Sequence, residues 1–276
     1  QRGNKIMKYQ VLVLDLDGTL TNSKKEITEP TRKALIEIQQ EGRIVVLASG
    51  RPINGVVPLA EELDLKKYGG YMLSFNGARI TQCSTGRLIY NKTVPPEVIR
   101  PIYESVRDQE GVNIISYSDT EIFSAKEPGR YTMLESRIND MEVIVSEDFP
   151  SILPPSVNKL LLPGEPEVLE ALMPHLKETY HGLLSIYRSE PFFLEIMPQN
   201  IDKATSLQKL LNSLGMTADE MICCGDGYND VSMIEYAGLG VAMGNAQPTV
   251  KDSADFVTRT NDEDGILHVI NLFMRD

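Results

Sequence analysis

The sequence contains few cysteines, no excess of positive charge and no long apolar run. Its three cysteines are Cys83, Cys223 and Cys224, and neither their number nor their spacing fits a disulfide framework or a zinc site. No apolar run reaches the roughly 18–20 residues that span a bilayer, and the first residues lack a signal-peptide pattern. We therefore expect a protein of the reducing cytoplasm without a membrane anchor. Gln1–Ile6 precede Met7 and are expected to be a non-native or unstructured start.

Acidic residues outnumber basic ones. There are 39 Asp and Glu against 27 Lys and Arg, which gives a net charge of −12. Such a surface has no basic field to attract nucleic acid or an anionic membrane, so any anionic substrate must be held by local charges. The 276 residues are enough for one large core or two modest domains. The sequence does not indicate an oligomeric state.

Two carboxylates follow the first apolar stretch. Val11–Leu14 is typical of a strand that is buried on both faces, as in a parallel sheet. Asp15 and Asp17 come next, two residues apart, so their side chains lie on the same side if the strand geometry persists, and Gly18 permits a sharp turn after them. Two anions this close repel each other unless a cation joins them.

Two other interpretations of this stretch have to be weighed. An isolated Asp-x-Asp-Gly is about equally well explained as an Asx turn that caps a strand. A calcium loop is the second alternative, because Glu26 falls at the position of its closing ligand. The calcium loop is disfavoured, since a helix should precede it and a glycine should replace Leu20.

Alternating strands and helices predict an α/β fold with a doubly wound, Rossmann-like parallel sheet. The expected core strands are Val11–Leu14, Ile44–Ala48, Tyr71–Phe75, Glu220–Cys224, Leu239–Met243 and Phe256–Val257. From about Cys83 the pattern changes to mixed strands and helices punctuated by prolines, which indicates an inserted α+β domain. We expect a core of residues 7–83 and 199–276, with the insertion at 84–198.

Four strand ends of the predicted core carry small polar or acidic residues, namely Asp15, Ser49, Asn76 and Asp226. In a doubly wound sheet these ends face one crevice, where ligands bind. Their convergence favours an active site over an isolated turn at Asp15.

In these motifs the sequence resembles the haloacid dehalogenase superfamily of phosphoryl-transfer enzymes, and within it the Cof-type phosphatases with a large inserted cap. The four motifs occur in order, and the resemblance covers nearly the whole chain. They are Asp15-Leu16-Asp17-Gly18-Thr19, Ser49-Gly50-Arg51, Lys203 and Gly225-Asp226-Gly227-Tyr228-Asn229-Asp230. The segments 240–246 and 261–265 also resemble Cof-type proteins.

The resemblance implies a chemical role for each acidic residue. Asp15 is the expected nucleophile, which forms an aspartyl phosphate, and Asp17 is the expected general acid and base. Mg²⁺ is the expected cofactor, with the side chains of Asp15 and Asp226 and the backbone carbonyl of Asp17 as ligands. Asp230 is expected behind them, reaching the metal through water or holding Lys203.

The transferred phosphoryl group requires fixed donors. The candidates are the Ser49 hydroxyl, the backbone N–H groups of Leu16 and Gly50, the Lys203 ammonium and the Asn229 amide. Lys203 stands at a predicted helix start, where a cation is unfavourable to the helix dipole, and this favours a functional role over a surface role.

Other polar residues stay open between a functional and a structural role. Arg51 could bind phosphate or cap the crevice, and Asn76 could orient substrate or form a turn with Gly77. The cap is expected to supply leaving-group specificity as lids do. Its residues Arg188 and Glu195 are candidates, although surface charges explain both more readily.

We therefore expect a magnesium-dependent phosphatase that acts on a small phosphorylated metabolite, such as a sugar phosphate. One alternative is a phosphomutase-like transferase, which passes the phosphoryl group from Asp15 to a second hydroxyl. The other is a non-catalytic regulatory domain that binds a phosphometabolite. The pair of acids argues against the latter, because binding alone does not need Asp17.

Overall fold

The computed structural model describes residues 8–275, so the expectation for Gln1–Ile6 lies outside the described residues. The chain forms two compact units. We call residues 8–50, 56–90 and 202–275 the core unit and residues 51–55 and 91–201 the insert unit. The sequence-based boundaries at residues 84 and 198 stay predictions, whereas the compact units change after residues 90 and 201.

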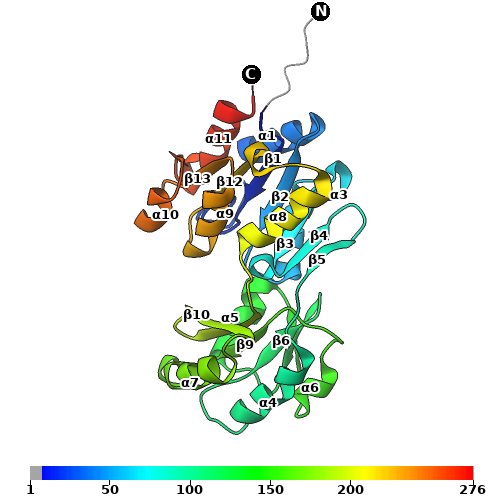
Figure 1. Cartoon of the computed structure of the whole chain (residues 1–276), viewed down its shortest axis with the longest axis vertical. Helices are drawn as coiled ribbons and strands as arrows, with labels where there is room; N and C mark the ends of the chain where they lie inside the picture. Colours follow the sequence, from blue (N-terminus) through cyan, green and yellow to red (C-terminus); the bar gives the residue numbers. More distant parts are fainter. Residues whose placement is uncertain (1–7, 276) are drawn as a thin grey trace, which may run out of the picture. The chain divides into compact units, whose positions relative to one another are not determined.

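The core unit contains an eight-stranded sheet in the order β14-β13-β12-β1-β2-β3-β4-β5 (Figure 1). Its strands are β1 (Val11–Leu14), β2 (Ile44–Ala48), β3 (Tyr71–Ser74), β4 (Arg79–Gln82), β5 (Leu88–Asn91), β12 (Met221–Gly225), β13 (Leu239–Ala242) and β14 (Phe256–Val257). The pairings from β14 to β3 are parallel, and β4 is antiparallel to β3. β1 lies in the middle of the parallel part, which places its carboxyl end beside those of β2 and β12.

Helices complete the core unit. They are α1 (Glu29–Gln40), α2 (Val57–Glu62), α3 (Leu65–Tyr68), α8 (Lys203–Leu214), α9 (Val231–Tyr236), α10 (Pro248–Asp252) and α11 (Gly265–Phe273). α8 and α9 contribute Leu207 and Met233 to an apolar cluster that includes Val11 and Val13 of β1. α1 and α11 pack against each other, and their Leu35 and Val269 are fully buried outside that cluster. The predicted α/β fold with a parallel-sheet core is confirmed.

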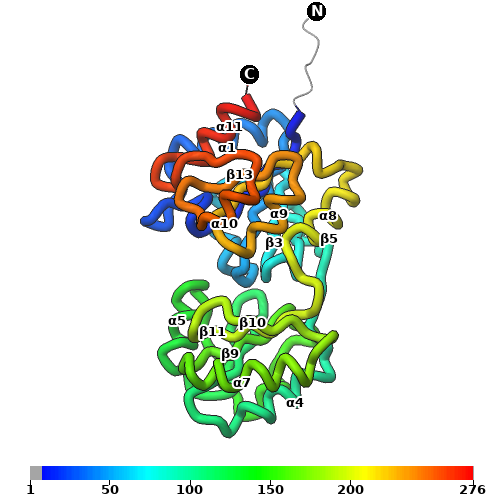
Figure 2. The backbone as a smooth tube through the Cα atoms, turned by 60° about the vertical axis from the view of Figure 1, so that its left-hand side comes forward, coloured from blue at the N-terminus to red at the C-terminus, as the bar shows by residue number. Residues whose placement is uncertain are grey.

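The insert unit contains a six-stranded sheet in the order β10-β11-β9-β6-β7-β8. Three of these strands, β9, β10 and β11, are labelled in Figure 2. Its strands are β6 (Ile115–Tyr117), β7 (Glu121–Ser124), β8 (Glu142–Val145), β9 (Leu160–Pro163), β10 (Leu184–Glu190) and β11 (Phe193–Pro198). Its helices are α4 (Pro96–Val106), α5 (Arg130–Asn139), α6 (Phe149–Ile152) and α7 (Pro166–Thr179). All strand pairs of this sheet are antiparallel except β7 and β8.

The two faces of the insert sheet differ in polarity. Leu160 and Ile196 pack in an apolar cluster with residues of α4 and α7. Lys159 and Glu195 precede these residues and therefore point to the opposite face, because successive strand residues alternate between faces. This polar pair is buried, so it must be satisfied within the protein.

One strand belongs to a different sheet from the one that the sequence pattern indicated. β5 (Leu88–Asn91) belongs to the core sheet, whereas the strands after about Cys83 were expected in the inserted domain. The chain returns along this sheet through a tight turn at Gly86, which has φ +73°. None of the described helices is long and apolar enough to cross a membrane.

Candidate active site

The turn after β1 brings the first acidic residue beside the loop after β12. The Asp15 N–H donates to the Cys224 carbonyl (3.0 Å), so the parallel ladder continues up to this residue. Gly18 has φ +78°, and a Cβ there would lie 2.3 Å from Asp226 Oδ2, so only glycine fits. The Thr19 hydroxyl donates to Asp226 Oδ1 (2.9 Å), which fixes the second loop against the first.

Three carboxyl groups meet at these strand ends. One oxygen each of Asp15, Asp226 and Asp230 lies within 4.8 Å of the others. Burial and then the neighbouring Asp230 raise the pKa of Asp15 well above its usual 3.8, and burial is the main cause that raises the pKa of Asp226. A cluster of anions in this environment favours a bound cation.

The donor set fits the expected metal. Carboxylate oxygens are the ligands that Mg²⁺ prefers, and the site offers oxygens rather than sulfur or imidazole nitrogen. The side chains of Asp15 and Asp226 could hold the ion, with the Asp17 carbonyl in the turn between them. These ligand roles stay predictions.

Lys203 is the fully buried cation of this cluster. It starts α8, and its Nζ donates to Asp15 Oδ1 (2.9 Å), Asp230 Oδ1 (2.6 Å) and the Ala48 carbonyl (2.9 Å). Burial alone would lower the pKa of Lys203, but Asp15 and Asp230 outweigh it and raise that pKa. The Lys203 ammonium thus contacts the proposed nucleophile directly.

Asp230 connects this lysine to the loop after β12. Its side chain is fully buried, and its second oxygen accepts from the N–H groups of Asp226 and Gly227 (3.0 Å each). A Cβ at Gly225 would lie 2.4 Å from the Asp230 Cβ, so glycine allows this approach. Asp230 therefore orients both Lys203 and the backbone that carries Asp226.

Three of the candidate phosphate donors, Ser49, Gly50 and Asn229, lie on two loops that Asn76 joins. The Asn76 N–H donates to the Ser49 carbonyl (3.0 Å), and Asn76 Oδ1 accepts from Asn229 Nδ2 (3.0 Å). A Cβ at Gly50 would lie 3.0 Å from the same Asn76 oxygen. Asn76 adopts φ +56°, a conformation that asparagine tolerates better than most residues. Sequence reasoning left its role open, and the structure gives it contacts on both loops.

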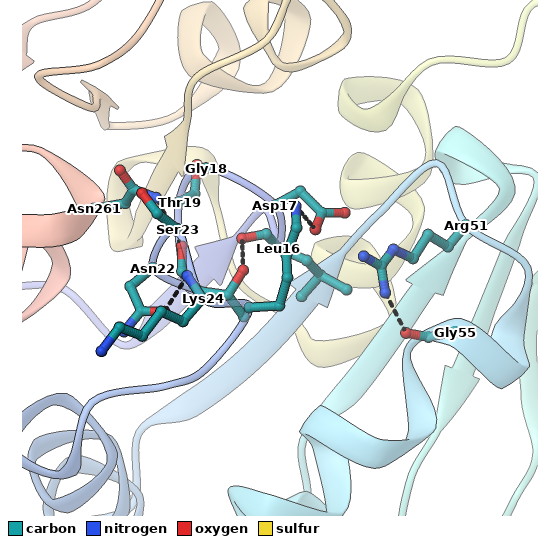
Figure 3. Close-up of polar contacts among 12 residues, drawn as sticks. Leu16, Asp17, Gly18, Thr19, Asn22, Ser23, Lys24, Arg51, Gly55 and Asn261 are labelled. Atoms are coloured by element: carbon teal, nitrogen blue, oxygen red, sulfur yellow. Dashed lines mark hydrogen bonds and ion pairs between the residues drawn. The ribbon is translucent and has the colours of Figure 1, made fainter. Parts of the chain in front are cut away.

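Asp17 is more accessible than the other acids. Its carboxylate pairs with Lys25 Nζ (2.9 Å), and the two side chains are 42% and 67% exposed, respectively. Leu16 is buried, and its carbonyl accepts from the Thr21 hydroxyl in the same turn (Figure 3). An accessible carboxylate can exchange protons with a leaving group or with water.

Arg51 belongs to the insert unit. Its Nη1 donates to the Gly55 carbonyl (3.3 Å), as Figure 3 shows. The structure therefore gives this residue a local contact within the Arg51–Gly55 loop. Its role in phosphate binding stays a prediction.

Sequence reasoning assigned no role to Thr19 and Lys25. Thr19 was part of the first motif, and its place directly after Gly18 was the available signal. Lys25 was missed because its contact with Asp17 depends on the loop of residues 22–26. Lys25 has φ +63°, and Asn22 Oδ1 accepts from the N–H groups of Lys24 and Glu26.

Comparison with known proteins identifies the family. The model of the haloacid dehalogenase-like hydrolases matches residues 12–270. The chain belongs to the haloacid dehalogenase-like hydrolases. The expected family and the expected class of enzyme, a hydrolase, are therefore confirmed.

Three similar proteins show how far the likeness to this hydrolase extends. A haloacid dehalogenase-like hydrolase from Bacteroides thetaiotaomicron is 46% identical, with a TM-score of 0.92 over 96% of this chain and 99% of that one. The structure of TM0651 from Thermotoga maritima is 32% identical, with a TM-score of 0.86 over 97% and 98% of the two chains. The 5-amino-6-(5-phospho-D-ribitylamino)uracil phosphatase YcsE of Bacillus subtilis is 32% identical over 95% of this hydrolase and 94% of its own length.

Proposed function

We propose that this hydrolase is a magnesium-dependent phosphatase that cleaves small phosphomonoesters, such as sugar phosphates, through an aspartyl phosphate on Asp15. The contact of Lys203 with both Asp15 and Asp230, inside a cluster of three acids, is the observation that carries the proposal. The name of the similar protein YcsE supports the substrate class, since it describes a phosphatase for a phosphoester of a ribityl chain.

In the first step a carboxylate oxygen of Asp15 attacks phosphorus, and the bond from phosphorus to the leaving oxygen breaks. Lys203 orients the attacking carboxylate through its hydrogen bond to Oδ1. Mg²⁺ held by Asp15, Asp226 and the Asp17 carbonyl would offset the negative charge that gathers when a phosphate meets these acids.

Asp17 moves the protons in both steps. As a carboxylic acid it protonates the leaving oxygen, which departs as an alcohol. The resulting Asp17 carboxylate then accepts a proton from the water that attacks the aspartyl phosphate. Inorganic phosphate is released, and the Asp15 carboxylate is regenerated. The exposure of Asp17 is compatible with both transfers.

The phosphoryl oxygens are bound by groups on three loops and at the start of α8. The proposed donors are the Ser49 hydroxyl, the N–H groups of Leu16 and Gly50, the Asn229 amide and Lys203. Asn76 fixes the distance between the Ser49 and Asn229 loops through its two hydrogen bonds. Removal of one such donor costs on the order of 100-fold to 1,000-fold in kcat in comparable sites.

The decisive experiment measures phosphate release from p-nitrophenyl phosphate and a panel of phosphorylated sugars, nucleotides and cofactors. Wild-type protein should be active with Mg²⁺ and inactive after EDTA treatment, and added Mg²⁺ should restore activity. Asp15→Asn is the matched control, since it keeps the shape of the side chain. Release by the wild type that does not exceed release by Asp15→Asn would contradict the proposal.

Labelled water tests hydrolysis against transfer. In H₂¹⁸O one labelled oxygen should enter the released phosphate at each turnover, because water attacks the aspartyl phosphate. Transfer of the phosphoryl group to a second hydroxyl, with no label in phosphate, would instead identify a phosphomutase-like transferase.

The prediction of a cytoplasmic enzyme fits the three free cysteines, Cys83, Cys223 and Cys224.

A further inference from the structure

We propose that two C-terminal loops, residues 244–246 and 260–265, position the acid–base residue Asp17 by fixing the backbone turn that follows β1. This inference rests on the proposed role of Asp17. The residues that act, Asn245 and Asn261, are positioning residues, because their hydrogen bonds reach the turn backbone rather than the reacting atoms. Both loops belong to segments that resemble Cof-type proteins, and no role was assigned to them above.

The first contacts fix the peptides on both sides of the turn. Asn245 Nδ2 donates to the Gly18 carbonyl (2.8 Å), and Asn261 Nδ2 donates to the Thr21 carbonyl (2.9 Å). Gly18 follows Asp17 directly and Thr21 forms an isolated β-bridge with Asp17, so both carbonyls belong to residues that adjoin the acid. Figure 3 shows Asn261 beside this turn.

The two asparagines also fix each other. The Asn261 N–H donates to Asn245 Oδ1 (3.0 Å), so the amide of Asn245 joins the second loop to the turn. At Gly244 a Cβ would lie 2.9 Å from the Thr260 nitrogen, so glycine lets the two loops lie close together. The loops therefore act on the turn as one connected element.

A second layer of contacts extends along the chain. Asp262 accepts hydrogen bonds from the N–H (2.8 Å) and the hydroxyl of Ser23, and Asp264 accepts from the Thr28 hydroxyl (2.5 Å). The segment from Gly18 to Thr28 is thus attached to the C-terminal loops at four residues.

The turn itself explains why such an attachment matters. Gly18 follows Asp17 directly and has φ +78°, and glycine is the residue with the largest backbone freedom. A displacement of about 1 Å at a catalytic group can cost on the order of 100-fold in rate. Fixing the Gly18 carbonyl limits this freedom and keeps the Asp17 carboxyl group at the leaving oxygen.

The test uses the isosteric variant Asn245→Asp, which keeps the acceptor for Asn261 but loses the donor to Gly18. kcat/KM is measured for an alkyl phosphate and for p-nitrophenyl phosphate, because this parameter includes the departure of the leaving group. Nitrophenolate leaves with little help from an acid, whereas an alkoxide needs a proton. Asp17→Asn serves as the reference for complete loss of the acid.

We expect Asn245→Asp to lower kcat/KM for the alkyl phosphate by roughly 100-fold and for p-nitrophenyl phosphate much less. The negative charge that Asn245→Asp adds should repel both substrates equally, because both are phosphate dianions. Its effect therefore cancels in the ratio of kcat/KM for the alkyl phosphate to kcat/KM for p-nitrophenyl phosphate. Asn261→Asp should change the ratio in the same direction.

Thr258→Val is the matched control. It removes the hydrogen bond from the Thr258 hydroxyl to the Gly265 carbonyl (2.8 Å) in the same region without touching the turn. It should lower both kcat/KM values by the same factor. A ratio for Asn245→Asp equal to that of the wild type would overturn the inference, while the wild-type activity would still support the proposed function. An inactive wild type would contradict the proposed function itself.

Discussion

Each unit of the molecule buries one lysine among carboxylates, and the two clusters differ in how the acids are arranged. In the core unit Lys203 contacts Asp15 and Asp230. In the insert unit Lys159 pairs with Glu195 (3.0 Å) and lies over the Tyr117 ring, 5.1 Å from its centroid. Neighbouring carboxylates outweigh the effect of burial and raise the pKa of both lysines.

The difference lies in the number of acids and in the groups that contact them. In the insert unit each carboxylate has a hydroxyl partner, since Glu195 accepts from Ser189 (2.7 Å) and Glu135 accepts from Tyr117 (2.8 Å). In the core unit three carboxyl groups crowd together, and burial raises the pKa of Asp15. We infer that the repulsion among the carboxylates of the core cluster has a catalytic purpose. The cluster around Lys159 in the insert unit, by contrast, stabilises the fold. The interpretation of Glu195 as a surface charge is wrong, because it is only 7% exposed.

The largest expected effect comes from Asp15→Asn, which should abolish turnover. Loss of the nucleophile in a comparable two-step enzyme costs roughly 10⁶-fold in kcat. The same variant should stabilise the metal-free protein at pH 7, because burial and the neighbouring Asp230 disfavour the Asp15 carboxylate more than Lys203 favours it. Activity assays and thermal unfolding in EDTA check both parts.

The sign of this stability effect follows from the pKa of Asp15. Its folded-state pKa lies above the ordinary 3.8, so ionisation destabilises the fold increasingly as the pH rises from 3.8 through the folded-state pKa. The stabilisation by Asp15→Asn should therefore vanish below pH 3.8. A variant that is less stable than the wild type in EDTA at pH 7 would contradict the picture of repulsion in the core cluster.

Replacement of Lys203 and of Lys159, one at a time, should show which cluster contributes to catalysis and which contributes only to stability. Lys203→Met should lower kcat/KM for p-nitrophenyl phosphate by about 1,000-fold. Both Lys203→Met and Lys159→Met should reduce the free energy of unfolding by about 3–5 kcal/mol, because each leaves a buried carboxylate without its cation. Lys159→Met should leave kcat/KM for this small substrate close to the wild-type value. Chemical denaturation and steady-state kinetics are the measurements.

The double variant Lys159→Met/Glu195→Leu is the control for the insert cluster. Because it removes both charges, it should recover most of the stability lost in Lys159→Met. If the double variant is no more stable than Lys159→Met, Lys159 and Glu195 contribute to stability beyond neutralising each other's charge.

The smallest expected effect concerns alkaline pH. The folded-state pKa of Lys159 lies above the ordinary 10.5, so its contribution to stability is complete below pH 10.5 and is lost as the pH rises through the folded-state value. The free energy of unfolding should therefore fall more steeply above pH 10.5 in the wild type than in Lys159→Met. Parallel slopes in urea titrations would contradict this assignment.

Sequence patterns predicted the parts of the fold that rest on local signals. The strand at Ile44–Ala48 was predicted with the bounds that the structure has, and Lys203 was predicted at a helix start, where α8 begins. Their apolar runs and the glycine at position 215 mark these elements without help from the rest of the fold. The position of Asp15 at a strand end was predictable for the same reason.

Contacts between distant segments could not be predicted. Nothing in the local sequence of Asn76 indicates that it joins Ser49 to Asn229, because that contact depends on the packing of three loops. β10 (Leu184–Glu190) was missed as well. Its outer residues are half-buried or exposed, and it pairs with β11 at the edge of the insert sheet. Edge strands have a weaker apolar pattern than central strands.

The central place of β1 also affects how the protein is made. β1 pairs with β2 on one side and with β12 on the other, and β12 begins only at Met221. On the ribosome, the core residues before position 91 therefore emerge with one edge of β1 unpaired until β12 is translated. The insert unit is complete by then, so the core unit is the last to complete its sheet.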